Sequence, residues 1–153
     1  YVDTSRANFL MTMDISVFSF TSVCRRAAAM MPDGGSLLTL TYYGAEKVMP
    51  HYNVMGVAKA GLEASVKYLA EDLGKDGIRV NLISAGPLRT TAAKGIPGFA
   101  TMEELWTDRA PLGWDLTDTE AAARGIIALL SDWFPATTGE MIHVDGGLHS
   151  TGA

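Results

Sequence analysis

The chain alternates long segments that have a helical spacing of apolar residues with short apolar segments that follow turn residues. The short segments have the length and composition of buried strands and span about 36–41, 78–84 and 140–147. Helical periodicity extends over about 4–31, 52–73 and 117–131. Because strands that alternate with helices join as parallel neighbours through crossovers, this order predicts an α/β fold with a parallel sheet.

Turn residues and caps mark the ends of the predicted helices. The Pro-Asp-Gly-Gly run at 32–35 stops the first helix, and Gly74 ends the second. Residues 117–120 have the spacing of a capping box for the third. Between the second strand and this third helix, the Gly and Pro content of 88–116 predicts a mobile loop that carries short helical pieces.

Size and composition restrict the possible functions. A chain of 153 residues suits one domain with its own core, and a charged fraction of 19% argues against disorder. The net charge of -5, without a compensating basic block, argues against nucleic-acid binding. No apolar run approaches the roughly 20 residues that cross a bilayer. The single cysteine, Cys24, is predicted to be a buried structural thiol, and these features together predict a cytoplasmic protein without a membrane partner.

Three strands make a poor free-standing parallel sheet, because both faces and both edges need cover. The chain opens on Tyr1 and shows neither an initiator methionine nor a signal or transit peptide. The Gly-rich βα turn that opens a dinucleotide-binding fold is absent, since 95–98 follows no strand and contains a proline. We therefore expect further βα units before Tyr1 and at most half of a nucleotide site within 1–153.

Tyr52 and Lys59 have a spacing that indicates chemistry. Seven residues are about two helical turns, so both side chains point the same way, roughly 10 Å apart along the axis. A phenol can donate to a developing oxyanion, while an ammonium group can hold a cofactor hydroxyl and favour proton donation. The same spacing also occurs on faces that serve packing and solubility, so the spacing alone leaves both interpretations open.

Further motifs accompany this pair in order along the chain. Tyr42 lies ten residues before Tyr52, at the end of a predicted strand. Met55 gives the pattern Tyr-x2-Met-x3-Lys. Two segments that contain strand residues and glycines follow, at 81–90 (Asn-Leu-Ile-Ser-Ala-Gly-Pro-Leu-Arg-Thr) and at 139–147.

These four matches resemble the short-chain dehydrogenase/reductase family and, within it, the NADH-dependent enoyl-acyl carrier protein reductases. Ordinary family members instead have a serine about thirteen residues before the tyrosine, a position that Thr39 holds here. The resemblance implies a Rossmann-like doubly wound parallel sheet, of which 1–153 would be the carboxyl-terminal part. It also implies NADH-dependent reduction of trans-2-enoyl thioesters of acyl carrier protein in fatty-acid biosynthesis, and a homotetramer that uses the two long helices and the final strand.

The resemblance implies catalytic roles for three residues. Tyr52 would stabilise the enolate, and Lys59 would hold the nicotinamide ribose hydroxyls. Tyr42 would line the acyl pocket and orient the substrate, with Met55 at its border. Packing at a strand end explains Tyr42 equally well, and a methionine such as Met55 is more often plain core. Tyr43 is predicted to point to the opposite side, because strand side chains alternate.

The segment after the second strand carries the remaining implied contacts. Gly86 and Pro87, the backbone near Leu88 and the hydroxyl of Thr90 would bind the nicotinamide amide and phosphates, although Gly-Pro also fits a plain turn. A substrate-binding lid would follow at about 91–116. Its acyl-lining residues would be Ala92, Ala93, Ile96, Phe99 and Met102. The candidates for docking the acidic carrier protein are Arg89, Lys94 and Lys47.

Two alternatives stay open. One is a short-chain reductase of ketones or hydroxyls, of the 3-oxoacyl reductase type, against which Tyr42 and Met55 count. The other is a non-catalytic scaffold, if the natural chain begins at Tyr1. The piece 1–153 alone is expected to be inactive, and NADPH stays possible because the residues that would bind the adenosine ribose lie outside it. The three histidines lack ligand spacing, so no metal site is predicted.

Overall fold

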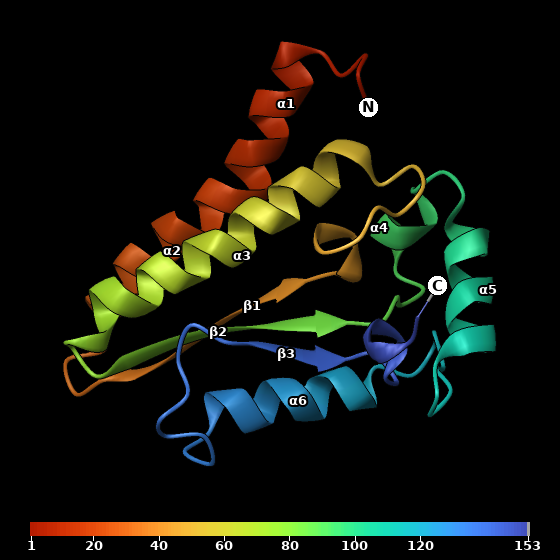
Figure 1. Cartoon of the computed structure of the whole chain (residues 1–153). Coiled ribbons are helices and arrows are strands. Elements are labelled where there is room, and N and C mark those ends of the chain that lie inside the picture. Colours follow the sequence, from red (N-terminus) through yellow and green to blue (C-terminus); the bar gives the residue numbers. More distant parts are fainter. Residues whose placement is uncertain (153) are drawn as a thin grey trace.

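The computed structural model describes residues 1–152, except for the side chain of Ala92. Helices and strands alternate along the chain, as the sequence pattern predicts (Figure 1). The elements are α1 (Arg6–Met13), the π-helical segment η1 (Asp14–Phe18), α2 (Ser19–Ala28), β1 (Gly35–Thr41), the 3-10 turn η2 (Tyr43–Ala45), α3 (Asn53–Gly74), β2 (Ile78–Ala85), α4 (Thr91–Lys94), α5 (Phe99–Arg109), α6 (Glu120–Leu130), β3 (Met141–Val144) and the 3-10 turn η3 (Leu148–Ser150).

The three strands form one parallel sheet in the order β1-β2-β3, which confirms the predicted α/β class. β1 pairs with β2 from Gly35↔Ile78 to Thr41↔Ser84, and β2 pairs with β3 from Leu82↔Met141 to Ala85↔Val144. The helix α3, with α1 and α2 beyond it, covers one face, and α6 covers the other (Figure 1). All three carboxyl ends therefore lie on one side, next to α4 and α5. Parallel sheets bind their ligands at this end.

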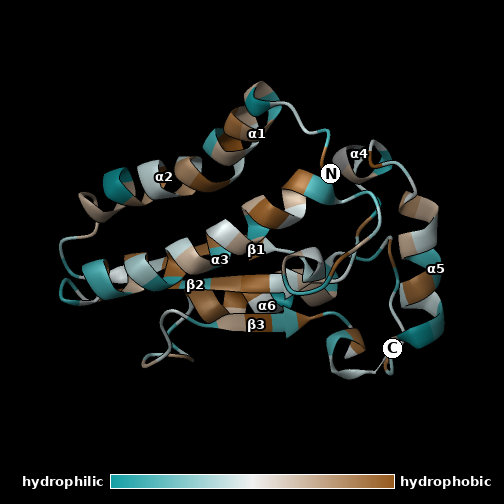
Figure 2. Ribbon diagram, turned by 45° about the horizontal axis from the view of Figure 1, so that its top comes forward, coloured by the Kyte–Doolittle hydropathy of each residue, from teal (hydrophilic) through white to brown (hydrophobic). Residues whose placement is uncertain are grey.

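The core between the sheet and α3 is built from apolar side chains that the strand pattern places on one face. Val80 and Leu82 of β2 are almost completely buried against Val66 of α3. Figure 2 shows the same pattern as hydrophobic colour along β2, β3 and α6. Cys24 of α2 joins this core with no exposed surface, which confirms the prediction of a buried thiol.

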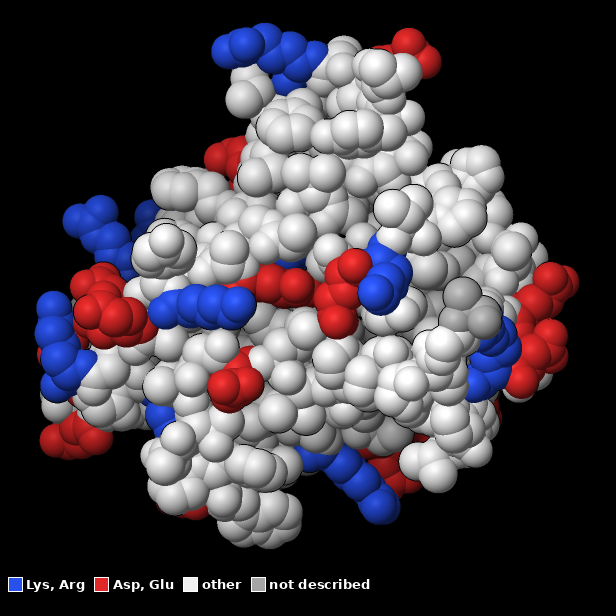
Figure 3. Space-filling model, in the orientation of Figure 1, with Lys and Arg blue, Asp and Glu red and all other residues white. Residues whose placement is uncertain are grey.

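The predicted long helix over about 4–31 is present as the continuous helical stretch Arg6–Ala28, but it contains a π-helical segment. The π-helical segment η1 separates α1 from α2, and Ile15 and Phe18 have exposed fractions of 62% and 61%. In Figure 3, the surface over α1 at the top of the view is largely uncharged below its tip. The stretch Arg6–Ala28 is long and apolar enough to cross a membrane, with a mean hydropathy of 1.2 and only 6% of its most apolar window buried. One such helix is weak evidence, because core helices of soluble proteins meet the same criterion.

The start of α6 also differs from the predicted capping box. Thr119 is the residue before the helix, and its side chain makes no capping bond. Instead Asp118 accepts the N–H of Glu120 at 2.8 Å, and Asp115 accepts both the N–H and the hydroxyl of Thr117. Aspartate side chains therefore satisfy the turn that the threonines were predicted to cap, since short polar side chains compete for the same backbone groups.

Candidate active site

Tyr52 lies immediately before α3 in an unusual backbone setting. Its two neighbours, His51 and Asn53, have positive φ angles of 66° and 46° although neither is glycine. Such conformations are unfavourable and cluster at functional sites, where the surrounding structure imposes them. The Tyr52 N–H donates to the Met49 carbonyl, and the Tyr52 carbonyl accepts the N–H of Met55. The strained turn therefore fixes the direction in which the phenol ring leaves the chain.

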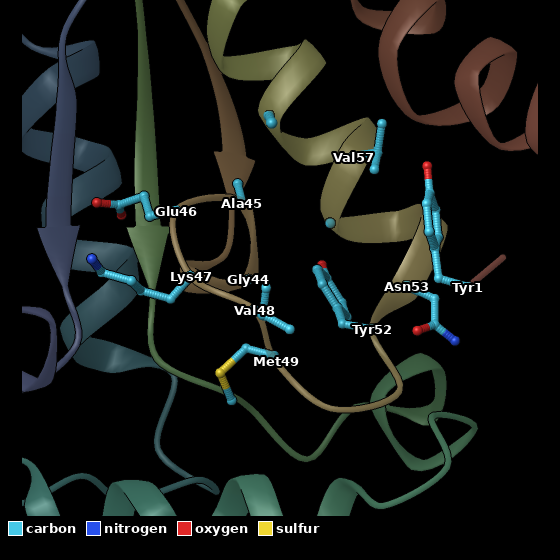
Figure 4. A pocket seen from close by; sticks show the side chains of 12 residues that line it. Tyr1, Gly44, Ala45, Glu46, Lys47, Val48, Met49, Tyr52, Asn53 and Val57 are labelled. Carbon is cyan, nitrogen blue, oxygen red and sulfur yellow. The ribbon is translucent and has the colours of Figure 1, made fainter. Parts of the chain in front are cut away.

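A pocket of about 470 Å³ opens beside Tyr52 (Figure 4). The Tyr52 ring lies between the loop that follows β1 and the side chain of Tyr1, while Glu46 and Lys47 extend from the loop away from the ring. The loop approaches closely because Gly44 has no side chain, since a Cβ there would lie 2.4 Å from the Tyr52 ring. The pocket is lined by Tyr1, residues 44–49, Tyr52, Asn53, Gly56, Val57 and Ala60.

The structure brings the predicted substrate-binding residues with described side chains together in one apolar cluster. The rings of Tyr42 and Tyr52 meet edge to face with centroids 5.1 Å apart. Met55, Ala93, Ile96, Phe99 and Met102 all belong to the same apolar cluster. Ala92 lies outside the described side chains. The role of these residues in binding a substrate stays a prediction.

Trp106 of α5 also belongs to this cluster, and it is not among the predicted site residues. It is completely buried and stacks on Tyr42, with ring centroids 5.5 Å apart. It also meets Tyr43 edge to face at 6.2 Å. The prediction that Tyr43 points to the opposite side is therefore wrong. The strand ends at Thr41 and Tyr43 opens the 3-10 turn η2, so strand alternation does not apply to it.

Both phenols of the site are protonated at neutral pH, and burial raises their pKa values further above neutrality. It raises the pKa of Tyr42, and the nearby phenol of Tyr52 adds to the effect. Burial also raises the pKa of Tyr52 to about 12, helped by the negative charge of Glu63. The Tyr42 hydroxyl is buried and has no hydrogen-bond partner among the described residues. Two neutral phenols can therefore act as donors here.

Lys59 is held against the end of β1. Its Nζ donates to the Leu40 carbonyl oxygen at 2.8 Å. Burial lowers the pKa of Lys59, and the charge of Glu63, one turn further along α3, opposes that decrease. Glu63 in turn accepts the Thr41 hydroxyl at 2.6 Å. The structure thus adds Thr41 and Glu63 to the surroundings of the predicted lysine.

The predicted nicotinamide-binding segment is fixed by Trp114. Gly86 and Pro87 are buried, and the Trp114 Nε1–H donates to the Pro87 carbonyl oxygen at 2.7 Å. The indole lies against Gly86 so closely that a Cβ on this glycine would be 2.5 Å from a ring carbon. The contact between Gly86 and Trp114 could not be predicted from the local sequence, because Trp114 is 28 residues further along the chain.

Further along the same segment, the Arg89 N–H donates to the Leu116 carbonyl oxygen. Leu88 is half-buried and Thr90 is exposed. The Thr90 hydroxyl oxygen accepts the N–H of Ala93 at 3.1 Å, which leaves its proton available to another acceptor. The Arg89 side chain pairs with Glu103 of α5 at 2.6 Å, so it contributes little free positive charge to the surface.

Two of the three histidines, His143 and His149, lie beside carboxylates. His143 Nε2 lies 2.8 Å from Glu46, and the ring of His149 stacks on His143 and contacts Asp145. Within residues 1–152, no three His, Cys, Asp or Glu side chains are placed to hold a metal ion.

Comparison with known proteins identifies the family. The family described as enoyl-(acyl carrier protein) reductase matches residues 1–149. The chain belongs to this family. It is 60% identical over 152 residues to enoyl-[acyl-carrier-protein] reductase [NADH] 1 of Rhizobium meliloti (strain 1021), an alignment that covers 99% of this chain and 56% of that protein.

Solved structures of family members match the fold closely. The enoyl reductase of Anaplasma phagocytophilum, solved with NAD, gives a TM-score of 0.91 at 54% identity, over 100% of this chain and 58% of that one. The Bacillus cereus enzyme, solved with NADP+ and an indole naphthyridinone, gives 0.93 at 52% identity, over 99% and 59%. These matches confirm the Rossmann-like fold. The chain spans less than three-fifths of the length of these relatives.

Proposed function

We propose that this chain is the carboxyl-terminal part of an NADH-dependent enoyl-acyl carrier protein reductase. The enzyme would reduce trans-2-enoyl thioesters of acyl carrier protein in fatty-acid biosynthesis. The observation that carries this proposal is the buried Tyr42–Tyr52 pair at the carboxyl end of β1, covered by the apolar residues of α4 and α5. The family match and the relative named for NADH support the reaction and the cofactor.

The residues fit the proton and oxyanion side of this reaction. Bound NADH supplies the hydride for the β-carbon of the substrate. Tyr52 is neutral at pH 7 and donates a hydrogen bond to the thioester oxygen as negative charge develops there. The Tyr42 hydroxyl, buried and without a partner among the described residues, is available to orient the same thioester. The arrangement therefore stabilises an enolate.

The residues also fit a nicotinamide cofactor. Lys59 uses one N–H on Leu40, so its other N–H groups are available to ribose hydroxyls. The segment from Gly86 to Leu88 directly follows β2, at the end of the sheet where such folds bind nucleotides. Thr90 adds a hydroxyl that can donate to the nicotinamide amide or phosphates. Because Trp114 holds this segment, the backbone is fixed before the cofactor arrives.

The proposal extends to the parts of the protein around this chain. β1 is an edge strand with no outer neighbour among residues 1–152, which is expected if further βα units precede Tyr1. Residues 91–116 serve as the substrate lid. The enzyme would be cytoplasmic. The exposed apolar side chains of Ile15 and Phe18 in η1 support a homotetramer that buries this part of the first helix. Lys47 and Lys94 are exposed and available to acyl carrier protein.

The direct test uses the product of the complete reading frame with two substrates. We expect NADH oxidation with a crotonyl thioester and little with an acetoacetyl thioester. Tyr52→Phe keeps the ring and removes the donor, so kcat should fall by about 10²–10³. Lys75→Gln is a matched control, because Lys75 lies after α3 and pairs only with Asp72 on the surface. Preferential turnover of the acetoacetyl thioester would instead identify a 3-oxoacyl reductase.

A further inference from the structure

Two hydrogen bonds tie the end of β1 to successive turns of α3. The Leu40 carbonyl oxygen accepts Lys59 Nζ at 2.8 Å, and the next residue, Thr41, donates its hydroxyl to Glu63 at 2.6 Å. Lys59 and Glu63 are four residues apart, which places them on one face of the helix. Thr41 directly precedes Tyr42. The contact thus connects the strand that carries one site tyrosine with the helix that carries the lysine.

Glu63 is a partly buried carboxyl group to which the proposed reaction assigns no role. Burial raises its pKa, and the Thr41 hydroxyl opposes this effect by its hydrogen bond. Glu46, from the turn after β1, raises the pKa further, while His143 of β3 and Lys67 of α3 lower it. Glu46 itself lies 2.8 Å from the His143 ring nitrogen, so the three side chains are neighbours. Because burial disfavours the charged form, an ionisable side chain held in such a site is a candidate for a functional role.

The charge of Glu63 acts on the groups that the reaction needs. It opposes the effect of burial on Lys59, and it contributes to the high pKa of Tyr52. Both effects favour the protonated forms, the ammonium that can hold ribose hydroxyls and the phenol that can donate. Glu63 and Lys59 are not a direct ion pair within 4.0 Å, and the hydrogen bond to Thr41 fixes the carboxylate instead.

We propose that Glu63, held by Thr41, is a positioning residue that maintains the charge of Lys59 and its place at the end of β1. The inference rests on the proposed function, in which Lys59 acts as an ammonium group. Glu63 is bonded to Thr41 and is not among the residues that line the pocket beside Tyr52. Its influence reaches the reaction through Lys59 and Tyr52, so it should change how activity depends on pH more than it changes stability.

Glu63→Gln in the product of the complete reading frame separates charge from hydrogen bonding. The glutamine oxygen still accepts the Thr41 hydroxyl, but the negative charge is gone. Lys59 and Tyr52 then lose their protons more easily, so the alkaline limb of kcat/KM for the crotonyl thioester should move to lower pH. One charge acting over about one helical turn in a partly solvated site gives a shift on the order of 0.5–1 pH unit.

Three variants complete the test. Glu71→Gln removes an exposed carboxylate two turns further along α3 and should leave the profile unchanged. Thr41→Val removes the hydroxyl that orients Glu63 and should move the limb in the same direction as Glu63→Gln. Thr41→Ser restores a hydroxyl and should return the profile to that of the wild type. A merely structural contact would lower the melting temperature in Thr41→Val without moving the pH profile.

A second measurement makes the inference independent of the substrate. The Cε carbon of Lys59, assigned with Lys59→Arg and titrated by NMR, should show a lower pKa in Glu63→Gln than in the wild type. An unchanged Lys59 titration overturns the inference even if the enzyme reduces crotonyl thioesters. Conversely, a wild-type protein that oxidises no NADH with crotonyl thioester contradicts the proposed function, while the lysine titration still decides the role of Glu63.

Discussion

The contact between Gly86 and Trp114 predicts a strong effect of one added methyl group. In Gly86→Ala, the new Cβ would lie 2.5–2.8 Å from three carbons of the indole, well inside van der Waals contact. The indole cannot simply turn away, because its Nε1–H donates to the Pro87 carbonyl oxygen at 2.7 Å. Either the overlap is absorbed by backbone shifts, which costs about 1–3 kcal/mol, or the hydrogen bond breaks, which costs a similar amount. We therefore expect a loss of about 2 kcal/mol.

Urea unfolding of the 153-residue chain measures this loss as a lower midpoint at constant m value. Gly74→Ala is the matched control, since nothing lies within 4 Å of its added Cβ at the end of α3, and it should be neutral or slightly stabilising. In a Trp114→Ala background the clash is gone, so the Gly86→Ala loss should nearly vanish, giving a coupling energy of about 1–2 kcal/mol. Equal losses with and without the indole would refute the proposed contact.

Three further predictions concern protonation, cofactor binding and the buried hydroxyl. The pKa of Tyr52 is about 12 in the folded state, against an ordinary value of 10.0. The contribution of the neutral phenol to folding stability is therefore present below pH 10 and is lost as the pH rises to 12. That loss should be about 2–3 kcal/mol in pH-dependent unfolding, and Tyr52→Phe should remove it. Fluorescence titration of the 153-residue chain with NADH should show no saturable binding, whereas saturation would contradict an incomplete site. Tyr42→Phe should stabilise the chain to urea by about 1 kcal/mol or more, because it removes a buried hydroxyl without a described partner, and a loss of stability would reveal a partner for it.

The parts of the fold predicted from sequence are those that local signals determine. β1, α3 and β2 begin and end within a residue or two of the predicted bounds, because turn residues enclose short apolar runs and Gly74 ends the long helix. The start of α6 was mispredicted, since two aspartate side chains changed the local bonding, and the π-helical segment inside the first helix was not predicted. Periodicity alone carries no information on such choices.

The site divides in the same way. Tyr52 directly before α3, Lys59 within α3 and Tyr42 directly after β1 follow from local sequence. Trp106 and Trp114 were missed, since each meets its partner only through the packing of segments distant in the chain. Glu63 was missed for a related reason. Its hydrogen bond to Thr41 joins two elements that are distant in the sequence, and a glutamate on a long helix is most often a solvated residue.

The aromatic cluster contains two buried polar groups that a ligand bound under the proposed lid, residues 91–116, could satisfy. Tyr42 and Trp106 stack beneath α5, yet the hydroxyl of one and the indole N–H of the other are buried without partners among the described residues. Each such group costs about 1–3 kcal/mol relative to one that is hydrogen-bonded. Apolar packing therefore stabilises this cluster, whereas the two unpaired polar groups destabilise it. In the proposed reaction, the thioester oxygen would accept from Tyr42 and remove that loss, so the proposed substrate would supply a partner that the apolar cluster lacks.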